Sequence, residues 1–264
     1  MRFLIVNDDG IQSEGIEKIA EMAVQMGETW VVAPDHQCSG MSQKITLNDN
    51  VRVTRWNFPV KGVYRAYACT GTPADCTDIA VKFLMKEAPD YVFSGINKGL
   101  NAGYDVAYSG TDGAAMEALL CGIPAIAFSH NNTDDFEVTN HYLREITEKI
   151  LEKTPYRDRI WNVNIPECTL AKCKGIEWNT RLADAGFYEP AYQLLRAEYP
   201  STEQEEYLLK EAGTRTNPEK FAPGTDLHAI MNGYISAGTV AWHGTQRTED
   251  NWQHGMESQR TVDM

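Results

Sequence analysis

The sequence lacks the features that mark several large classes of protein. No apolar run approaches the roughly 18 residues of a membrane-spanning helix, and the N-terminus has no apolar stretch typical of a signal peptide. There is also no run of Lys and Arg, and the formal net charge is −13, which would repel a polyanion. We therefore expect a cytoplasmic protein that binds neither a membrane nor long nucleic acids.

Two ligand-binding motifs are missing as well. The glycine motif G-x-G-x-x-G of dinucleotide-binding folds does not follow the first predicted strand, which argues against a Rossmann cofactor site. The six cysteines lack the paired C-x2-C spacing of a zinc site. Cys168 and Cys173 form at most one pair of metal ligands, and we interpret most of the cysteines as reduced core residues.

What the sequence does contain is a strand, loop and helix at its start. The apolar run 3–6 is typical of a buried strand and ends in Asn7-Asp8-Asp9-Gly10, after which apolar residues follow helical spacing. Asp8 and Asp9 are thus placed at the carboxyl end of a strand, the edge where α/β sheets bind ligands. Adjacent carboxylates repel each other, and a divalent cation would offset that repulsion. The alternative is a simple Asp-Gly turn.

Three further apolar runs are predicted strands, at 30–33, 91–93 and 125–128, and each ends in polar residues. Ser39-Gly40 follows the first of them and Asn97 follows the second. Because parallel strands bring their carboxyl ends to one edge, we expect these loops to meet. The helical spacing between the runs predicts an α/β fold with a Rossmann-like, three-layer core around a parallel sheet.

A long polar loop over 94–105 contains three glycines and leads to a helix that begins near Ala114. Thr111 is the predicted N-cap of this helix, and Gly122 follows its end. A helix N-terminus presents free N–H groups and a partial positive charge, which suits a phosphate. The alternative is that Ser109 and Thr111 only cap the helix.

The rest of the chain contains fewer candidate catalytic or ligand-binding residues. The stretch 185–219 is acidic and rich in tyrosine, and we interpret it as a solvated excursion or dimer arm. We expect residues 1–180 to form the core and 181–264 a smaller C-terminal extension containing strands and helices. The other expected elements are a β-hairpin over 45–56, a helix from Thr72-Pro73, a helix over 137–152, a strand over 161–165 and a short helix from Thr225.

Five segments resemble the SurE family, the survival-protein 5′/3′-nucleotidases. The long central segment from Ser94 to Ser129 is highly specific, and the later patch is moderately so. The matching segments are VNDDGI at 6–11, APD followed by SG at 33–40, TGTPADC at 70–76, SGINKGLNAGYDVAYSGTDGAAMEALLCGIPAIAFS at 94–129, and TDLHAIMNGYIS at 225–236.

The resemblance implies a C-terminal region exchanged between subunits, in a homodimer or homotetramer, and one divalent metal ion per subunit. The implied metal ligands are Asp8, Asp9, Ser39 and Asn97, of which Asp8, Asp9 and Asn97 are also the expected catalytic residues. All offer oxygen atoms, as Mg²⁺ or Mn²⁺ prefers. The implied substrate-binding residues are Gly40, Asn101, Ser109, Gly110 and Thr111.

The implied reaction is hydrolysis of nucleoside 5′- and 3′-monophosphates to nucleoside and phosphate, by attack of a metal-bound water. The alternative is a sensor that binds nucleotide and metal without turnover. Asp112 supports the sensor, since it puts a negative charge where the family motif has an apolar residue. An aspartyl-phosphate mechanism would need an Asp-x-Asp pair, whereas Asp8 and Asp9 are adjacent. This spacing favours attack by water, with direct attack by an aspartate as the alternative.

Overall fold

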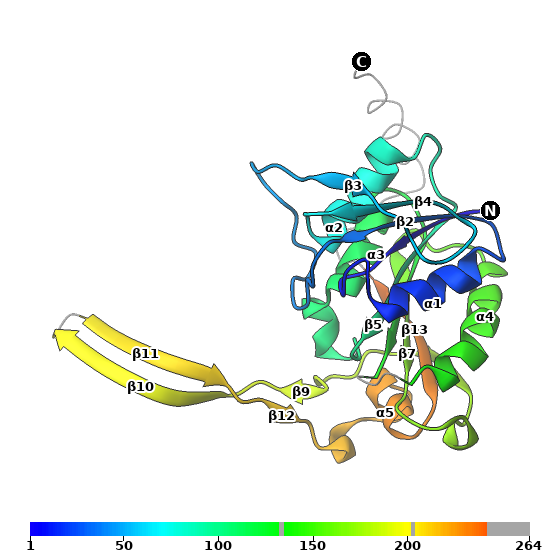
Figure 1. Cartoon of the computed structure of the whole chain (residues 1–264). Helices are drawn as coiled ribbons and strands as arrows, with labels where there is room; N and C mark the ends of the chain where they lie inside the picture. The colour runs from blue at the N-terminus through cyan, green and yellow to red at the C-terminus, as the bar shows by residue number, and fades with distance from the viewer. Residues whose placement is uncertain (132–134, 202–203, 242–264) are drawn as a thin grey trace.

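The computed structural model of the protein describes residues 1–131, 135–201 and 204–241. A nine-stranded sheet runs through its centre in the order β3-β4-β2-β1-β5-β6-β7-β13-β8 (Figure 1). Its parallel part comprises β4 (Val63–Cys69), β2 (Glu28–Pro34), β1 (Arg2–Val6), β5 (Tyr91–Lys98), β6 (Ala125–His130) and β7 (Arg159–Ile165). The central strands read as continuous apolar runs because both faces of the sheet are buried.

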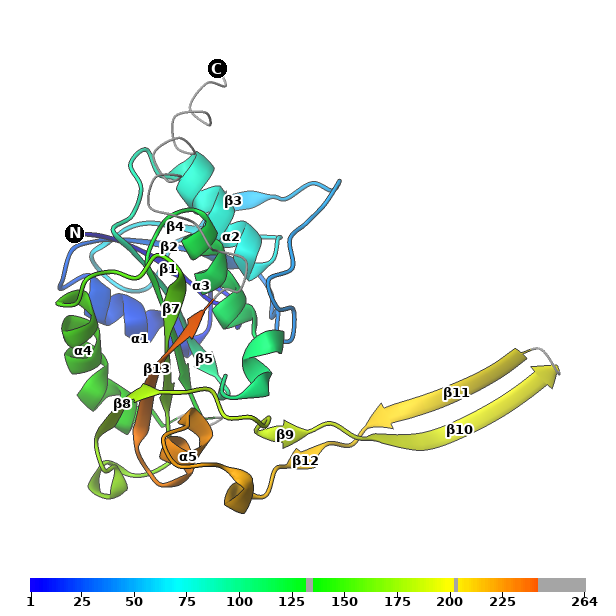
Figure 2. The ribbon, with the colours of Figure 1, turned by 180° about the vertical axis from the view of Figure 1, so that it is seen from behind.

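Helices cover both faces of this sheet (Figure 2). Phe3 and Ile5 of β1 point to the face covered by α1 (Glu14–Ala23) and α4 (Glu137–Leu151). Leu4 and Val6 alternate with them and point to the face covered by α2 (Pro73–Ile79), η1 (Ala80–Leu84) and α3 (Gly110–Leu120). The predicted three-layer α/β core is confirmed. No helix within the described residues has the length and apolar character needed to cross a membrane.

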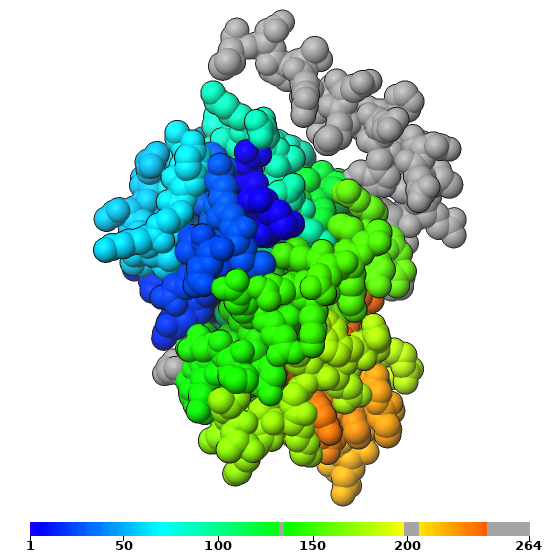
Figure 3. All heavy atoms as spheres, turned by 90° about the vertical axis from the view of Figure 1, so that its right-hand side faces the viewer, coloured from blue at the N-terminus to red at the C-terminus, as the bar shows by residue number. Residues whose placement is uncertain are grey.

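The edges of the sheet are mixed rather than parallel. β3 (Val53–Arg55) pairs antiparallel with β4, while β13 (Ile235–Ala241) lies between β7 and β8 (Ile176–Thr180). The C-terminal part of the chain therefore adds a strand to the main sheet, and α5 (Asp226–Met231) precedes that strand. In the side view of Figure 3, the orange residues of this part lie directly against the green residues of the core.

A long hairpin projects from this body (Figures 1 and 2). It consists of β10 (Tyr192–Ser201) and β11 (Gln204–Glu211), and the short pair β9 (Tyr188–Glu189) and β12 (Thr214–Arg215) joins it to the core. The predicted excursion over 185–219 is thus a two-stranded arm. The division of the chain at residue 180 stays a prediction. Three short helices complete the fold: η2 (Tyr104–Tyr108), η3 (Leu170–Lys172) and η4 (Pro218–Lys220).

The helix start at Thr72 is confirmed, and its details explain why the predicted hairpin over 45–56 is wrong. Thr72 and Asp75 form a reciprocal capping box. The Asp75 carboxylate also accepts bonds from the backbone and hydroxyl of Thr46, which hold that segment against α2 instead of in a strand. Only Val53–Arg55 becomes a strand, and its partner is β4. Alternation of polar and apolar residues predicts a strand, but it does not identify the strand with which it pairs.

The predicted N-cap of α3 is also wrong, by one half turn. Ser109 is the N-cap, and its Oγ accepts a hydrogen bond from the backbone N–H of Asp112. Thr111 lies inside the first turn, where its hydroxyl is free to contact another element. The predicted end is confirmed, because Cys121 is the C-cap and Gly122 follows with a φ of +83°.

Candidate metal and phosphate site

The candidate site lies where the connectivity of the sheet reverses. From β1 the chain builds β2 and β4 on one side, and then returns to place β5, β6 and β7 on the other side. The loops that leave β1 and β5 run in opposite directions, which opens a crevice at the carboxyl ends of these strands. Asp8 and Asp9 follow β1, and Asn97 lies near the end of β5.

Hydrogen bonds join the three loops that carry the predicted metal ligands. The backbone N–H of Lys98 donates to Asp9 Oδ2 at 2.9 Å, and the N–H of Cys38 donates to the backbone oxygen of Asp8 at 2.7 Å. Asn97 and Ser39 are the immediate neighbours of these two donors. The structure therefore brings the loops of all four predicted ligands together. Ser39 and Gly40 are exposed, whereas Asn97 is buried.

Asp8 is the most buried of the predicted ligands, with 3% of its surface exposed. The pKa of its carboxyl is raised to about 6, chiefly by burial and also by the charge of the neighbouring Asp9, while a hydrogen bond from Thr111 opposes the rise. That bond runs from Thr111 Oγ1 to Asp8 Oδ1 at 2.6 Å. Burial also raises the pKa of Asp9, and the N–H of Lys98 opposes this. The positive charge of Lys98 opposes the rise as well.

Gly110 lets the N-terminus of α3 approach Asp8. A Cβ at position 110 would lie 2.9 Å from both Cβ and Oδ2 of Asp8, too close for any side chain. Because of this contact the first turn of α3, with its free N–H groups, faces the carboxyl end of β1. Ser109, Gly110 and Thr111, three of the predicted substrate-binding residues, are thus beside the predicted metal ligands.

The donor atoms at this site fit a hard divalent cation. Asn97 Nδ2 donates to the backbone oxygen of Gly99 at 2.7 Å, so its carbonyl oxygen is the atom left to bind a cation. Asp8 accepts hydrogen bonds from Thr111, and Asp9 accepts them from the backbone N–H of Lys98 and the side chain of Gln37. A carboxylate has about four lone-pair sites, so each can still bind a cation. Ser39 adds a hydroxyl. Carboxylate, amide and hydroxyl oxygens are the ligands that Mg²⁺ and Mn²⁺ prefer.

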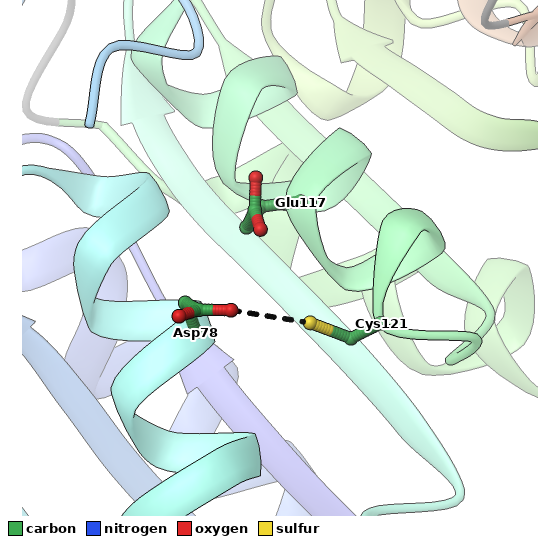
Figure 4. A group of neighbouring side chains, drawn as sticks. All are labelled: Asp78, Glu117 and Cys121. Carbon is green, nitrogen blue, oxygen red and sulfur yellow. Dashed lines mark hydrogen bonds between the residues drawn. The ribbon is translucent and has the colours of Figure 1, made fainter. Parts of the chain in front are cut away.

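A second group of three metal-binding residue types lies elsewhere, on α2 and α3 (Figure 4). The ligand atoms of Asp78, Glu117 and Cys121 lie within 4.8 Å of one another. Asp78 pairs with Lys82, and Glu117 accepts a bond from Gln43. Burial raises the pKa of the Cys121 thiol to about 12, and its Sγ donates to Asp78 at 3.6 Å. These partners account for the group without a metal.

Asn101 is held by a buried network that the sequence did not reveal. Its backbone N–H donates to Asn164 Oδ1 at 2.8 Å, and its backbone oxygen accepts from Asn162 and Asn164 at 2.8 and 2.9 Å. Its side chain donates to Ser129 Oγ at 2.8 Å. The signal was the alternation of asparagine with apolar residues in 161–165, because a strand buried on both faces rarely carries polar side chains without a structural task.

Asp112 is fully buried in the first turn of α3, next to Thr111. It is 1% exposed, and neither carboxylate oxygen has a hydrogen-bond partner within the described part of the chain. The pKa of its carboxyl is raised to about 7, chiefly by burial and also by the charges of Asp8 and Asp226. The negative charge expected at position 112 is therefore largely absent below pH 7.

The chain is similar in sequence to known proteins over most of its length. Residues 3–188 match the family model described as "Survival protein SurE". A Vibrio cholerae protein named 5′-nucleotidase SurE is 37% identical over 257 residues, which cover 96% of this chain and 97% of that protein. An Aeromonas hydrophila protein of the same name is 37% identical over 89% of this chain and 90% of its own length.

The fold is also found in a solved structure. The crystal structure of the SurE protein from Aquifex aeolicus is similar to this chain with a TM-score of 0.73. The two are 30% identical in sequence, and the match covers 98% of each chain. The arrangement of the sheet is thus common to both proteins.

We predict that Asn164 stabilises the loop that carries Asn101. Replacing Asn164 by Ala leaves a buried N–H and a buried C=O short of partners, which should lower the free energy of unfolding by about 1–3 kcal/mol. Asn140→Ala, the same change on the exposed face of α4, is the matched control. Urea denaturation measures both, and equal stability of the two variants would contradict the assigned network.

We also predict that Asp112 destabilises the fold as pH rises. Its folded pKa of about 7 lies above the ordinary 3.8, so the folded protein keeps a proton that the unfolded chain releases. Stability is therefore lost between about pH 4 and pH 7 and stays lower above it. Asp112→Asn removes this titration and should raise the free energy of unfolding at pH 8 by up to about 4 kcal/mol.

The measurement is denaturant unfolding of the metal-free protein at pH 4.5 and pH 8. Wild type and Asp112→Asn should differ little at the lower pH and diverge at the higher one. A constant difference between them at both pH values would show that the carboxyl does not titrate in this window.

Proposed function

The chain belongs to the SurE family, and from this premise we propose that it is a metal-dependent phosphomonoesterase of nucleoside 5′- and 3′-monophosphates. Its relatives named 5′-nucleotidase support nucleotidase activity. The observation that carries the finer proposal is the set of oxygen donors at the reversal point of the sheet, directly beside the N-terminus of α3. Products would be a nucleoside and inorganic phosphate.

In this proposal Asp8, Asp9, Ser39 and Asn97 hold one divalent ion per subunit, Mg²⁺ or Mn²⁺. Such an ion polarises a phosphoryl oxygen and lowers the pKa of a water molecule. Asp8 must first lose its proton, because its pKa is raised to about 6. Thr111 donates to Oδ1 of that carboxylate, so the hydroxyl of Thr111 orients Asp8 and leaves lone pairs of the carboxylate for the ion.

The first turn of α3 is the proposed cradle for the phosphoryl group. Free N–H groups and the helix dipole favour an anion there, and Ser109 contributes a hydroxyl hydrogen while its oxygen caps the helix. Gly40 and Asn101 complete the proposed wall. Because the pKa of Asp112 is raised to about 7, this group repels an anion less near neutral pH than an ordinary aspartate would, which weakens the main reason for preferring a sensor without turnover.

We further propose that the β10–β11 arm contacts another subunit. Six large apolar side chains on the arm have exposed fractions of 48% to 70%, and apolar residues exposed together are typical of an interaction surface. They are Tyr192, Leu194, Leu195, Tyr207, Leu208 and Leu209. A homodimer or homotetramer in which the C-terminal region is exchanged would bury them.

The proposed reaction predicts release of phosphate from nucleoside monophosphates in the presence of Mg²⁺ or Mn²⁺. Asp9→Asn should lower kcat/KM by at least about 100-fold, since it removes a charged group that acts on the transition state. Asp49→Asn, in an exposed loop, is the matched control and should keep full activity. A panel of 5′- and 3′-monophosphates, diphosphates and triphosphates defines the range. No release from any monophosphate would leave the sensor as the better assignment.

Metal binding should weaken in acid. Asp8 carries a proton below about pH 6, and a cation must displace it, so the apparent affinity for Mn²⁺ should fall up to about tenfold for each pH unit below 6. Above about pH 7 the affinity should level off. Calorimetric titration with Mn²⁺ from pH 5 to pH 8 tests this, and an affinity that does not change over that range would exclude Asp8 as a titrating ligand.

A further inference from the structure

A cavity of about 310 Å³ lies within the connection between β3 and β4, away from the strand ends that form the proposed catalytic site. Its wall includes Arg55, Trp56, Phe58, Tyr64 and Arg65. Arg65 pairs in register with Trp30 at the start of β2, whereas Ser39 follows the other end of that strand. At about 3.3 Å per residue, roughly 15 Å of strand separates the cavity from the candidate metal site.

The segment around this cavity is basic in a strongly acidic protein. Residues 50–74 contain four basic residues and no acidic residue, although the chain as a whole has 37 acidic and 24 basic residues. The basic residues are Arg52, Arg55, Lys61 and Arg65. Over the ranges 1–131, 135–201 and 204–241, none of the four makes an ion pair. Their charge is therefore available to an anion.

The arginine and the aromatic rings are arranged for a planar ligand that carries negative charge. The guanidinium carbon of Arg65 lies 5.5 Å from the ring centre of Tyr64 and 5.8 Å from that of Trp30. This stacking holds the guanidinium in place without neutralising it, and a bond to the Tyr67 hydroxyl fixes it further. Tyr64 is 52% exposed, which leaves ring surface open for another ring.

The base of the cavity is rigid. The backbone N–H of Trp56 donates to the oxygen of Ala66 at 2.8 Å and continues the pairing of β3 with β4. Trp56, Phe58 and Val63 pack against the hydrophobic core on the side of α1. Arg55, by contrast, is exposed at the rim. Arg55 pairs with Tyr67, and Arg65 donates to the hydroxyl of Tyr67, so both arginines lie on the sheet face of Tyr67. Trp56 and Phe58 pack on the other face, so the ring beside the arginines is that of Tyr64.

We propose that this cavity is a second ligand site, which binds a free mononucleotide with its base against the exposed ring of Tyr64 and its phosphate between Arg55 and Arg65. Its volume is at the lower end of the range of about 300–1,000 Å³ found for small-molecule sites, which suits a mononucleotide and excludes a polymer. The exposed ring of Tyr64 favours a nucleotide over phosphate alone, because bases stack on such rings. The site is separate from the proposed function, since it contains no metal ligand and no catalytic group.

Binding of adenosine monophosphate, measured by equilibrium dialysis in the presence of a chelator, tests the proposal without turnover. The Arg55→Gln/Arg65→Gln variant should lose one class of binding sites, with affinity reduced at least tenfold. Arg52→Gln removes a charge of the same segment outside the cavity wall and should bind as the wild type does, as should Asp9→Asn. This behaviour of Asp9→Asn distinguishes the cavity from the catalytic site.

Two further probes separate the contributions of ring and charge. Adenosine and inorganic phosphate, each used as a competitor, should displace the nucleotide at least tenfold less well than unlabelled adenosine monophosphate. Unchanged binding to the double variant, or equal competition by phosphate alone, would overturn the proposal. If circular dichroism shows that the double variant does not fold, Arg55→Gln alone decides, because Arg55 is exposed at the rim.

Discussion

The burial of the Asp8 carboxylate is the constraint on which the site depends. A carboxylate removed from water needs positive charge or hydrogen bonds, and the polypeptide supplies Asp8 with one short bond from Thr111 instead of a basic side chain. That bond requires α3 to begin against β1, which in turn requires glycine at position 110. The position of α3 and the first turn that it presents thus follow from one buried group.

The need of buried polar groups for hydrogen bonds also explains the asparagine side chains beside the site. Asn162 and Asn164 lie in a strand covered on both faces, where an unsatisfied amide would be costly. They are satisfied by the backbone of Asn101, so the loop after β5 is tied to β7 across the intervening β6. Rigid strands therefore position a loop that has no regular structure of its own. A loop fixed in this way loses little entropy when it binds a ligand.

Much of the fold could be predicted from the sequence, because apolar runs and helical spacing report burial directly. The buried strands, the start of α2 at Thr72 and the meeting of the loops at 8–9, 39 and 97 belong to this class. Partner choice could not be predicted: the segment around Thr46 alternates like a strand, but Asp75 binds it. The half-turn error at α3 has a similar origin, since Ser109 and Thr111 are equally good caps by type and only the contact with Asp8 distinguishes them.

The charge state of each ionisable group depends on its local surroundings rather than on the net charge of −13. Burial raises the pKa of Asp8, Asp112 and Asp226, and the charges of Asp8 and Asp226 raise that of Asp112 further in a buried region where electrostatic interactions are strong. Because these carboxyl groups are desolvated, their negative charge can be removed by protonation or offset by a bound cation. The basic residues near the β3–β4 edge are separated from the candidate metal site by roughly 15 Å of strand, about two Debye lengths at physiological salt, so the acidic groups there are largely screened from them. Each group in this acidic protein therefore responds mainly to the charges in its immediate surroundings.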